Sequence, residues 1–267
     1  MPMLSAYLLV SHGSHDPRPE IAMSHLAFSV QSRFQKIESQ QDKISYSKYA
    51  GGVAAPPQCE TKYETVGTAY LELQPQPLHL QIVEFAQNIL SRSTEQSLHL
   101  KILPLFLLAG VHVMEDIPTE VEAAQRILGD NVVIDLQPYI GCHGGLVDLV
   151  RLQKNSIRAQ KYILLAHGSR RPGFEHHTET LAANLGLTTA YWAVQPKLES
   201  RVKEFASSGY REIAVIPYFL FAGGITDAIE TTIEKLELQF PGVSLKLAQP
   251  LGVNEEFADL IWDYLHK

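Results

Sequence analysis

Two phrases of this amino-acid sequence occur twice, and each copy lies in a different half of the chain. YLLVSHGSHDPR begins at Tyr7 and YILLAHGSRRPG begins at Tyr162, so an apolar run is followed both times by His-Gly-Ser. A second phrase, LPLFLLAGVHVMEDI from Leu103, returns as IPYFLFAGGITDAI from Ile216. Self-similarity at such long spacing indicates a tandem duplication. We therefore expect two halves with the same fold.

Length and composition are typical of a globular enzyme with two domains of modest size. At 267 residues, each half is long enough to bury a core of its own. The formal net charge of −7 and the absence of a basic stripe argue against nucleic-acid binding. No apolar run reaches the roughly 18 residues of a membrane span, and the first residues lack the basic region of a signal peptide. We expect a cytoplasmic protein without membrane or nucleic-acid partners.

The hydrophobic pattern predicts strands that alternate with helices throughout the chain. In the first half, strands are expected at 6–11, 68–73, 98–107 and 131–136, with helices at 17–37, 78–90, 118–128 and 145–157. In the second half, strands are expected at 161–166, 189–194, 212–220 and 243–248, with helices between them and a last helix at 254–266. This alternation favours right-handed βαβ units. The predicted fold is α/β: two tandem flavodoxin-like domains, 1–157 and 158–267, each a four-stranded parallel sheet flanked by helices.

One stretch of the first half has no counterpart in the second. Residues 38–66 are polar and contain a Gly-Gly and a Pro-Pro pair, and they lengthen the connection between the first two predicted strands. We interpret this insertion as a surface excursion or a partly disordered loop. A lid over the site of the first half is the alternative.

Three side chains that can bind metal stand at strand ends of the first half. His12 follows the first predicted strand, Glu72 lies on the second, and His112 follows the third. Ligands of open parallel sheets collect at the carboxyl ends of the strands, so we expect these three to converge. Two imidazoles and a carboxylate can bind a divalent metal with positions left open, and imidazole also takes up protons near neutrality. A single loop histidine is usually a hydrogen-bonding residue, but three converging groups favour a functional site.

The second half keeps little of this constellation. Alignment of the repeats places Ala193 opposite Glu72 and Ile225 opposite His112, so only His167 remains. We expect His167, with Ser169, to serve packing or loop hydrogen bonding. Its alternative role is to line the cleft between the halves.

Three motifs of this sequence resemble those of a known family. The motifs are, in order, HGSHDPR, YLEL and LPLFLLAGVHVMEDIP. The family that they resemble is the sirohydrochlorin chelatases of the long, two-half form. These enzymes are class II tetrapyrrole chelatases. The resemblance implies a lyase that inserts Co²⁺ or Fe²⁺ into sirohydrochlorin without ATP, toward cobalamin or sirohaem. The catalytic and metal-binding residues of the family fall on His12, Glu72 and His112. No P-loop is present, and Cys59 and Cys142 are too few for the iron–sulfur cluster of some members.

The implied substrate carries many carboxylates, so hydrogen-bond donors and cations are needed around it. We expect Ser14, Arg18 and Gly110 to contact sirohydrochlorin, together with helix N-termini. For Arg18, a solvated surface charge is an equal alternative. His15 lies beside the site and is a weaker candidate. Because both halves are in one chain, we expect a monomer.

The segment after His112 has two interpretations. Asp116 and Glu120 follow at spacings of four, which in a continuous helix places all three on one face as a metal path. Pro118 instead favours a helix that starts near Asp116 or Ile117, with Glu120 capping its first turn. We favour capping.

Other functions are also compatible with parts of the pattern. The His-Gly-Ser phrases superficially resemble the Arg-His-Gly motif of phosphatases that use a phosphorylated histidine. However, Ser11 and Ala166 precede the histidines where an arginine is required. A non-catalytic metal or tetrapyrrole carrier of the same fold remains the main alternative. An inactive structural protein is disfavoured because the first half keeps all three groups.

Overall fold

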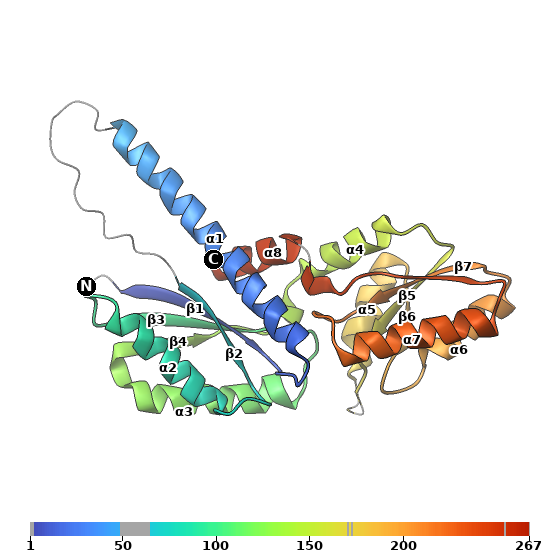
Figure 1. The fold of residues 1–267 in the computed structure, drawn as a ribbon, viewed down its shortest axis with the longest axis horizontal. Helices are drawn as coiled ribbons and strands as arrows, with labels where there is room; N and C mark the ends of the chain where they lie inside the picture. The colour runs from blue at the N-terminus through green and yellow to red at the C-terminus, as the bar shows by residue number, and fades with distance from the viewer. Residues whose placement is uncertain (1–2, 49–64, 170, 172, 254, 267) are drawn as a thin grey trace.

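The computed structural model of the chain describes residues 3–48, 65–169, 171, 173–253 and 255–266. It consists of two α/β halves side by side, each built on one parallel sheet (Figure 1). The first sheet has the order β2-β1-β3-β4, with the strands β1 (Leu4–Ser11), β2 (Thr65–Tyr70), β3 (Leu98–Pro104) and β4 (Val132–Leu136). The second has the order β6-β5-β7-β8, with the strands β5 (Lys161–Ala166), β6 (Thr188–Tyr191), β7 (Glu212–Pro217) and β8 (Ser244–Leu247). The order is the same in both, so the predicted pair of flavodoxin-like sheets is confirmed.

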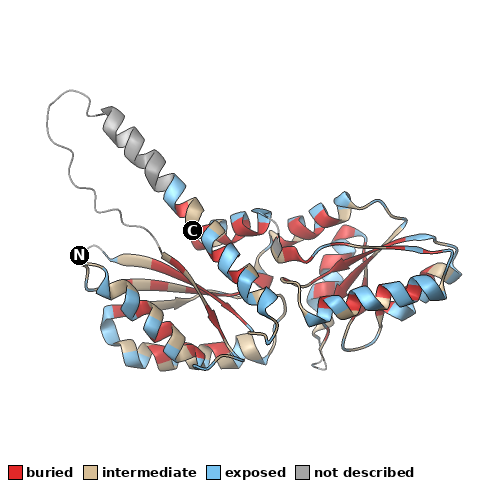
Figure 2. Ribbon diagram, in the orientation of Figure 1, coloured by how far each residue is buried: buried red, intermediate tan, exposed pale blue. Residues whose placement is uncertain are grey.

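Helices cover both faces of each sheet, and alternate strand residues pack against each layer. The helices are α1 (Pro17–Lys48), α2 (Leu78–Ser91), α3 (Ile117–Leu128), α4 (Leu146–Ser156), α5 (Glu175–Leu185), α6 (Leu198–Ser207), α7 (Gly224–Gln239) and α8 (Glu255–His266). In β1, Leu8 and Val10 belong to a core with α2 and α3, whereas Tyr7 and Leu9 face α1. Because both faces are buried, the strands are continuous apolar runs (Figure 2).

The last helix of each half packs against the other half. Figure 1 shows α8 beside α1, and Arg33 of α1 donates from Nε to Asp259 Oδ1 at 2.6 Å. In return, α4 lies over the second sheet, and Lys154 Nζ donates to the carbonyl of Leu185 at 2.7 Å. One hydrophobic core runs through both halves between these helices. The expected boundary near residue 157 therefore separates the two sheets but not the helices that cover them.

Several element bounds differ from the sequence-based expectation. Helix α1 continues to Lys48, so residues 38–48 of the expected loop are helical, and residues 49–64 lie outside the described part of the chain. Strand β2 ends at Tyr70 rather than 73, and β3 ends at Pro104 rather than 107. The residues after Pro104 are apolar because they pack in the core or line a cleft, not because they extend the sheet.

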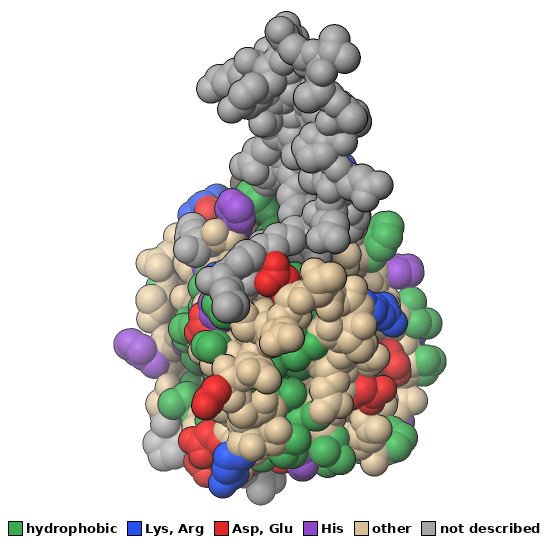
Figure 3. All heavy atoms as spheres, turned by 90° about the vertical axis from the view of Figure 1, so that its left-hand side faces the viewer, with side chains coloured by type: hydrophobic (Ala, Val, Ile, Leu, Met, Phe, Trp, Pro, Cys, Tyr) green, Lys and Arg blue, Asp and Glu red, His purple; other side chains and the backbone are tan. Residues whose placement is uncertain are grey.

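Within the described residues, no helix is long and apolar enough to cross a bilayer. On the face of the first half seen in Figure 3, acidic, basic and apolar side chains are interspersed.

Candidate functional site

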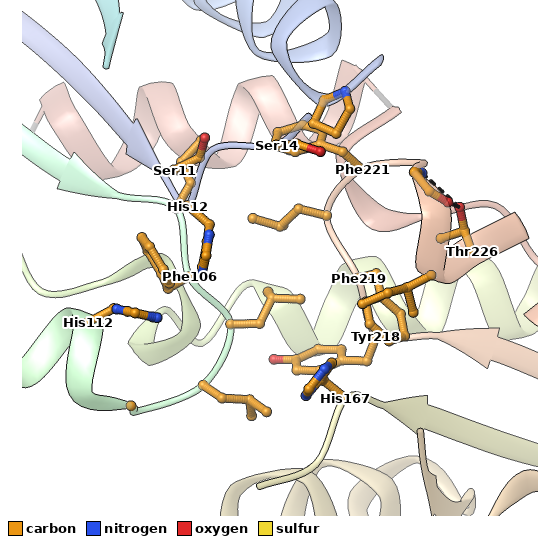
Figure 4. A pocket seen from close by; sticks show the side chains of 18 of the residues that line it. Ser11, His12, Ser14, Phe106, His112, His167, Tyr218, Phe219, Phe221 and Thr226 are labelled. Carbon is orange, nitrogen blue, oxygen red and sulfur yellow. Dashed lines mark hydrogen bonds between the residues drawn. The ribbon is translucent and has the colours of Figure 1, made fainter. Parts of the chain in front are cut away.

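A cleft of about 810 Å³ lies between the two halves, at the carboxyl ends of the strands. The first half contributes the loops after β1 and β3, and the second half contributes the loops after β5 and β7 (Figure 4). The walls are largely apolar, with Phe106 and Leu108 on one side and Val194, Phe219 and Phe221 on the other. A cleft with this lining suits a ligand that has a large apolar surface.

Backbone pairing beyond the strand ends brings His12 and Glu72 together. The amide of Glu72 donates to the carbonyl of His12 at 2.9 Å, which continues the β1–β2 ladder past its last paired residues. Glu72 therefore lies two residues beyond β2, not on it as expected. Its Oε2 is 3.7 Å from His12 Nε2, and both side chains are about half exposed.

A glycine makes this approach possible. Gly13 has φ +98°, and a Cβ built on it lies 2.0 Å from the carbonyl oxygen of Glu72. A larger residue at this position is disfavoured by the left-handed backbone, and its Cβ would displace the backbone of Glu72. The Gly of the first His-Gly-Ser phrase thus fixes the spacing between His12 and Glu72.

His112 reaches the same point from a different element. It begins η1 (His112–Asp116), a π-turn that leads directly into α3. Its ring stands nearly perpendicular to that of His12, with 4.7 Å between the centroids. Its Nδ1 lies 2.8 Å from Asp116 Oδ2, and since a carboxylate only accepts, Nδ1 is the donor. The Nε2 of His112 therefore keeps its lone pair for a metal or a proton.

The three predicted side chains form one metal-sized cluster. One ligand atom from each of His12, Glu72 and His112 lies within 4.8 Å of the others, and no other such group of three occurs among the described residues. His12 and His112 line the cleft, whereas Glu72 does not. The imidazoles of the cluster therefore face the cleft, whereas its carboxylate faces bulk solvent.

The residues expected to contact substrate are only partly in place. Ser14 and Gly110 line the cleft, but Arg18 and His15 do not. The guanidinium of Arg18 is bonded to Asp16, which directly precedes α1, and to both carboxylate oxygens of Asp227, at 2.9 and 2.6 Å. The hydrogen bond from Arg18 lowers the pKa of Asp16 to about 2. Arg18 thus links α1 to α7, which corrects its expected role as a substrate contact.

Glu120 has neither of its two expected roles. Its Oε2 accepts hydrogen bonds from the backbone amide of His79 and lies 2.8 Å from the His79 ring, so it binds the first turn of α2. The start of α3 has no side-chain cap. The favoured capping interpretation was therefore wrong, and Glu120 is turned away from His112 and toward a neighbouring helix.

On the opposite wall, the second half contributes His167 and Tyr218 to the cleft. Nδ1 of His167 lies 2.9 Å from the carbonyl oxygen of Gly168, so His167 makes the loop hydrogen bond and also lines the cleft. The hydroxyl of Tyr218 is 3.1 Å from Nε2 of His177, a contact that sequence reasoning missed. The signal was available in the repeat, since Tyr218 stands opposite Leu105 of the first half.

Charged groups are found at the rim of the cleft. No lysine or arginine lines the cleft within the described ranges. At the rim, Arg171 of the second half pairs with Glu115 of η1 at 3.5 Å. The interior of the cleft is consequently apolar apart from its histidines and a few hydroxyls.

Comparisons with known proteins extend over both repeats. The sequence profile of the CbiX family matches residues 44–155 and 161–266. The sirohydrochlorin ferrochelatase of Priestia megaterium is 25% identical over 173 residues, which cover 60% of this chain and 64% of that protein. The sirohydrochlorin cobaltochelatase of the same organism is 21% identical over 176 residues, or 60% of this chain and 57% of that protein. The chain thus spans less than two thirds of the length of these relatives.

Solved structures share the fold over nearly the whole chain. SirB from Bacillus subtilis with Fe³⁺ superposes with a TM-score of 0.71 at 18% identity, covering 99% of this chain and 95% of that one. The structure of CbiX described as the terminal enzyme for biosynthesis of siroheme in denitrifying bacteria has a TM-score of 0.61 at 17% identity, covering 98% of both chains. At these identities the likeness establishes the arrangement of the two halves.

Proposed function

Since this chain belongs to the CbiX family, we propose that it is a lyase that inserts Co²⁺ or Fe²⁺ into sirohydrochlorin without ATP, toward cobalamin or sirohaem. The observation that carries the proposal is the cluster of His12, Glu72 and His112 at the edge of an apolar cleft. The names of the two Priestia relatives support both metals as candidates. Imidazole and carboxylate suit either ion, so metal supply decides between them.

The metal ion is a substrate in this reaction, and the cluster is suited to hold it only briefly. Two neutral imidazoles and one carboxylate bind a divalent ion and leave positions for the macrocycle nitrogens. Glu72 is half exposed and lies outside the cleft lining, so it takes the ion from solvent. His12 and His112 present the ion to the cleft, and Asp116 orients His112 through Nδ1.

The macrocycle lies flat between the two apolar walls, with Phe106 on the metal side and Phe219 and Phe221 on the other. Its carboxylates extend toward the rim. There, the hydroxyl of Ser14 and the first turn of α7 at Gly224 offer hydrogen-bond donors. Both halves of one chain enclose the substrate, so a monomer is sufficient.

The test is an anaerobic absorbance assay with purified protein, sirohydrochlorin and either Co²⁺ or Fe²⁺. We expect many turnovers per protein, faster than the uncatalysed reaction, and loss of turnover in His12→Ala. The ratio of the two rates gives the preferred metal. A spectral change that stops at one equivalent of protein would contradict catalysis and identify a carrier of metal or tetrapyrrole.

A further inference from the structure

The wall opposite the metal cluster presents one unused imidazole to the cleft. His167 is exposed and follows β5 as His12 follows β1, and it lies across the cleft from His12 and His112 (Figure 4). Its Nδ1 is bonded to the carbonyl of Gly168, which accepts only, so the proton of a neutral ring is on Nδ1. Nε2 therefore has a free lone pair, and no described residue bonds to it.

His167 is the one base on that wall within the described residues. The neighbouring lining residues Ala193, Val194 and Ile225 have no titratable group. Tyr218 also lines the wall, but burial raises the pKa of its phenol well above the usual range, and its hydroxyl is already bonded to His177. A phenol that stays protonated cannot accept a proton from a substrate.

The proposed reaction requires a base on this face. Metal insertion breaks two N–H bonds of the macrocycle and forms metal–nitrogen bonds. As the nitrogens turn their lone pairs toward an ion on one face, their hydrogens move to the opposite face. While His12 and His112 hold the ion, their Nε2 lone pairs are in use and cannot accept protons.

We propose that His167 is a catalytic proton acceptor on the face of the macrocycle opposite the metal. The proposal rests on the chelatase function proposed above. The first N–H bond breaks as Nε2 of His167 takes the proton, and the open side of the cleft passes it to water. The ion then passes from His12 and His112 to the ring nitrogens, and His167, having released the first proton to water, takes the second proton from the same face. Two protons leave as one divalent ion enters, so charge and atoms balance.

The experiment measures Co²⁺ affinity and insertion rate separately in His167→Ala. We expect an unchanged Co²⁺ affinity and an insertion rate at least tenfold lower, since general base catalysis contributes about 10²–10⁴-fold. Added imidazole should restore part of the rate. His167→Gln keeps a donor for the Gly168 carbonyl but has no proton acceptor of this kind, so it should be as slow as His167→Ala. His176→Ala is the matched control, because His176 is exposed on α5 outside the cleft lining.

Each outcome decides between the two proposals. A wild-type rate in His167→Ala, beside active wild-type protein, would overturn the role of His167 alone. Recovery of the rate in His167→Gln without imidazole would also overturn it, because it would indicate a purely structural hydrogen bond. If the wild-type protein itself gives no turnover, the chelatase function fails, and the role of His167 fails with it.

Discussion

The two halves of this chain have the same strand order, but the backbone of the loops that border the cleft differs between them. The phrase from Leu103 to Ile117 has 15 residues, and its counterpart from Ile216 to Ile229 has 14. Both end on a fully buried isoleucine. The first half takes up the extra residue as the π-turn η1, whereas α7 of the second half begins at Gly224 without one. A π-turn is a one-residue insertion in an α-helix, which explains the difference.

A second irregularity lies next to Glu72. Leu73 has φ +59°, the one non-glycine residue with positive φ among those described. Such a backbone costs on the order of 1–3 kcal/mol and persists where the surrounding structure requires it. Both irregular segments flank the metal cluster. At the corresponding described positions, the second half has neither the π-turn nor a positive φ at a non-glycine residue, has a cis Gln195–Pro196 peptide bond, and lacks the ligands. The duplication thus preserved the fold twice and the strained, ligand-bearing geometry once.

The largest difference in insertion rate is expected when the two halves are mutated at aligned positions. His112→Ala should reduce insertion at least about a hundredfold, because it removes one of the three metal ligands. Ile225→Ala, at the aligned position of the second half, should change it less than about threefold, since it removes only apolar contact area. Steady-state rates of both variants check this. Equal losses would contradict a site confined to the first half.

The second-largest effect is expected when the π-turn of the first half is converted to regular α-helix. Deletion of Met114, which is 60% exposed, converts the π-turn to α-helix and rotates His112 by about 100° relative to α3. We expect Co²⁺ affinity to fall at least tenfold while the circular dichroism spectrum stays native. An alanine inserted after Ile225 in α7 is the reciprocal control and should leave Co²⁺ affinity unchanged. A deletion variant that binds Co²⁺ normally would show that the π-turn does not position His112.

A smaller effect is expected at the paired glycines of the repeated phrase. Gly13→Ala and Gly168→Ala both place a Cβ at positive φ, and each should lower the free energy of unfolding by about 1–3 kcal/mol. Only Gly13→Ala pushes against the backbone of Glu72, so it alone should weaken Co²⁺ binding, by about tenfold. Urea denaturation and metal titration separate the two effects. Equal metal affinity in both variants would contradict the positioning role of Gly13.

Much of the fold and the metal cluster could be predicted from the sequence. The apolar runs of parallel strands are strong signals, and the rule that ligands collect at strand ends brought His12, Glu72 and His112 together correctly. The predicted ends of the strands were less accurate. The residues after Pro104 are apolar like those of β3, but they pack in the core or line the cleft instead of extending the strand. Residues 38–48 have little apolar periodicity, so their helix could not be predicted from it.

Contacts between distant elements had no sequence signal. Arg18 is adjacent to the site in the chain, but Asp227 on α7 takes its guanidinium. Glu120 has the spacing of a cap, but its Oε2 accepts a hydrogen bond from the amide of His79 on another helix. The exchange of α4 and α8 between the halves likewise depends on tertiary packing. In each case, spacing in the sequence allows several partners for a side chain or helix, and the tertiary structure determines which of them it contacts.

A Co²⁺ titration followed by visible absorption tests the central claim most directly. The account predicts one tight equivalent per chain, lost in His12→Ala and in His112→Ala and retained in His167→Ala. Two tight equivalents, or loss of binding in His167→Ala, would contradict a single metal site in the first half.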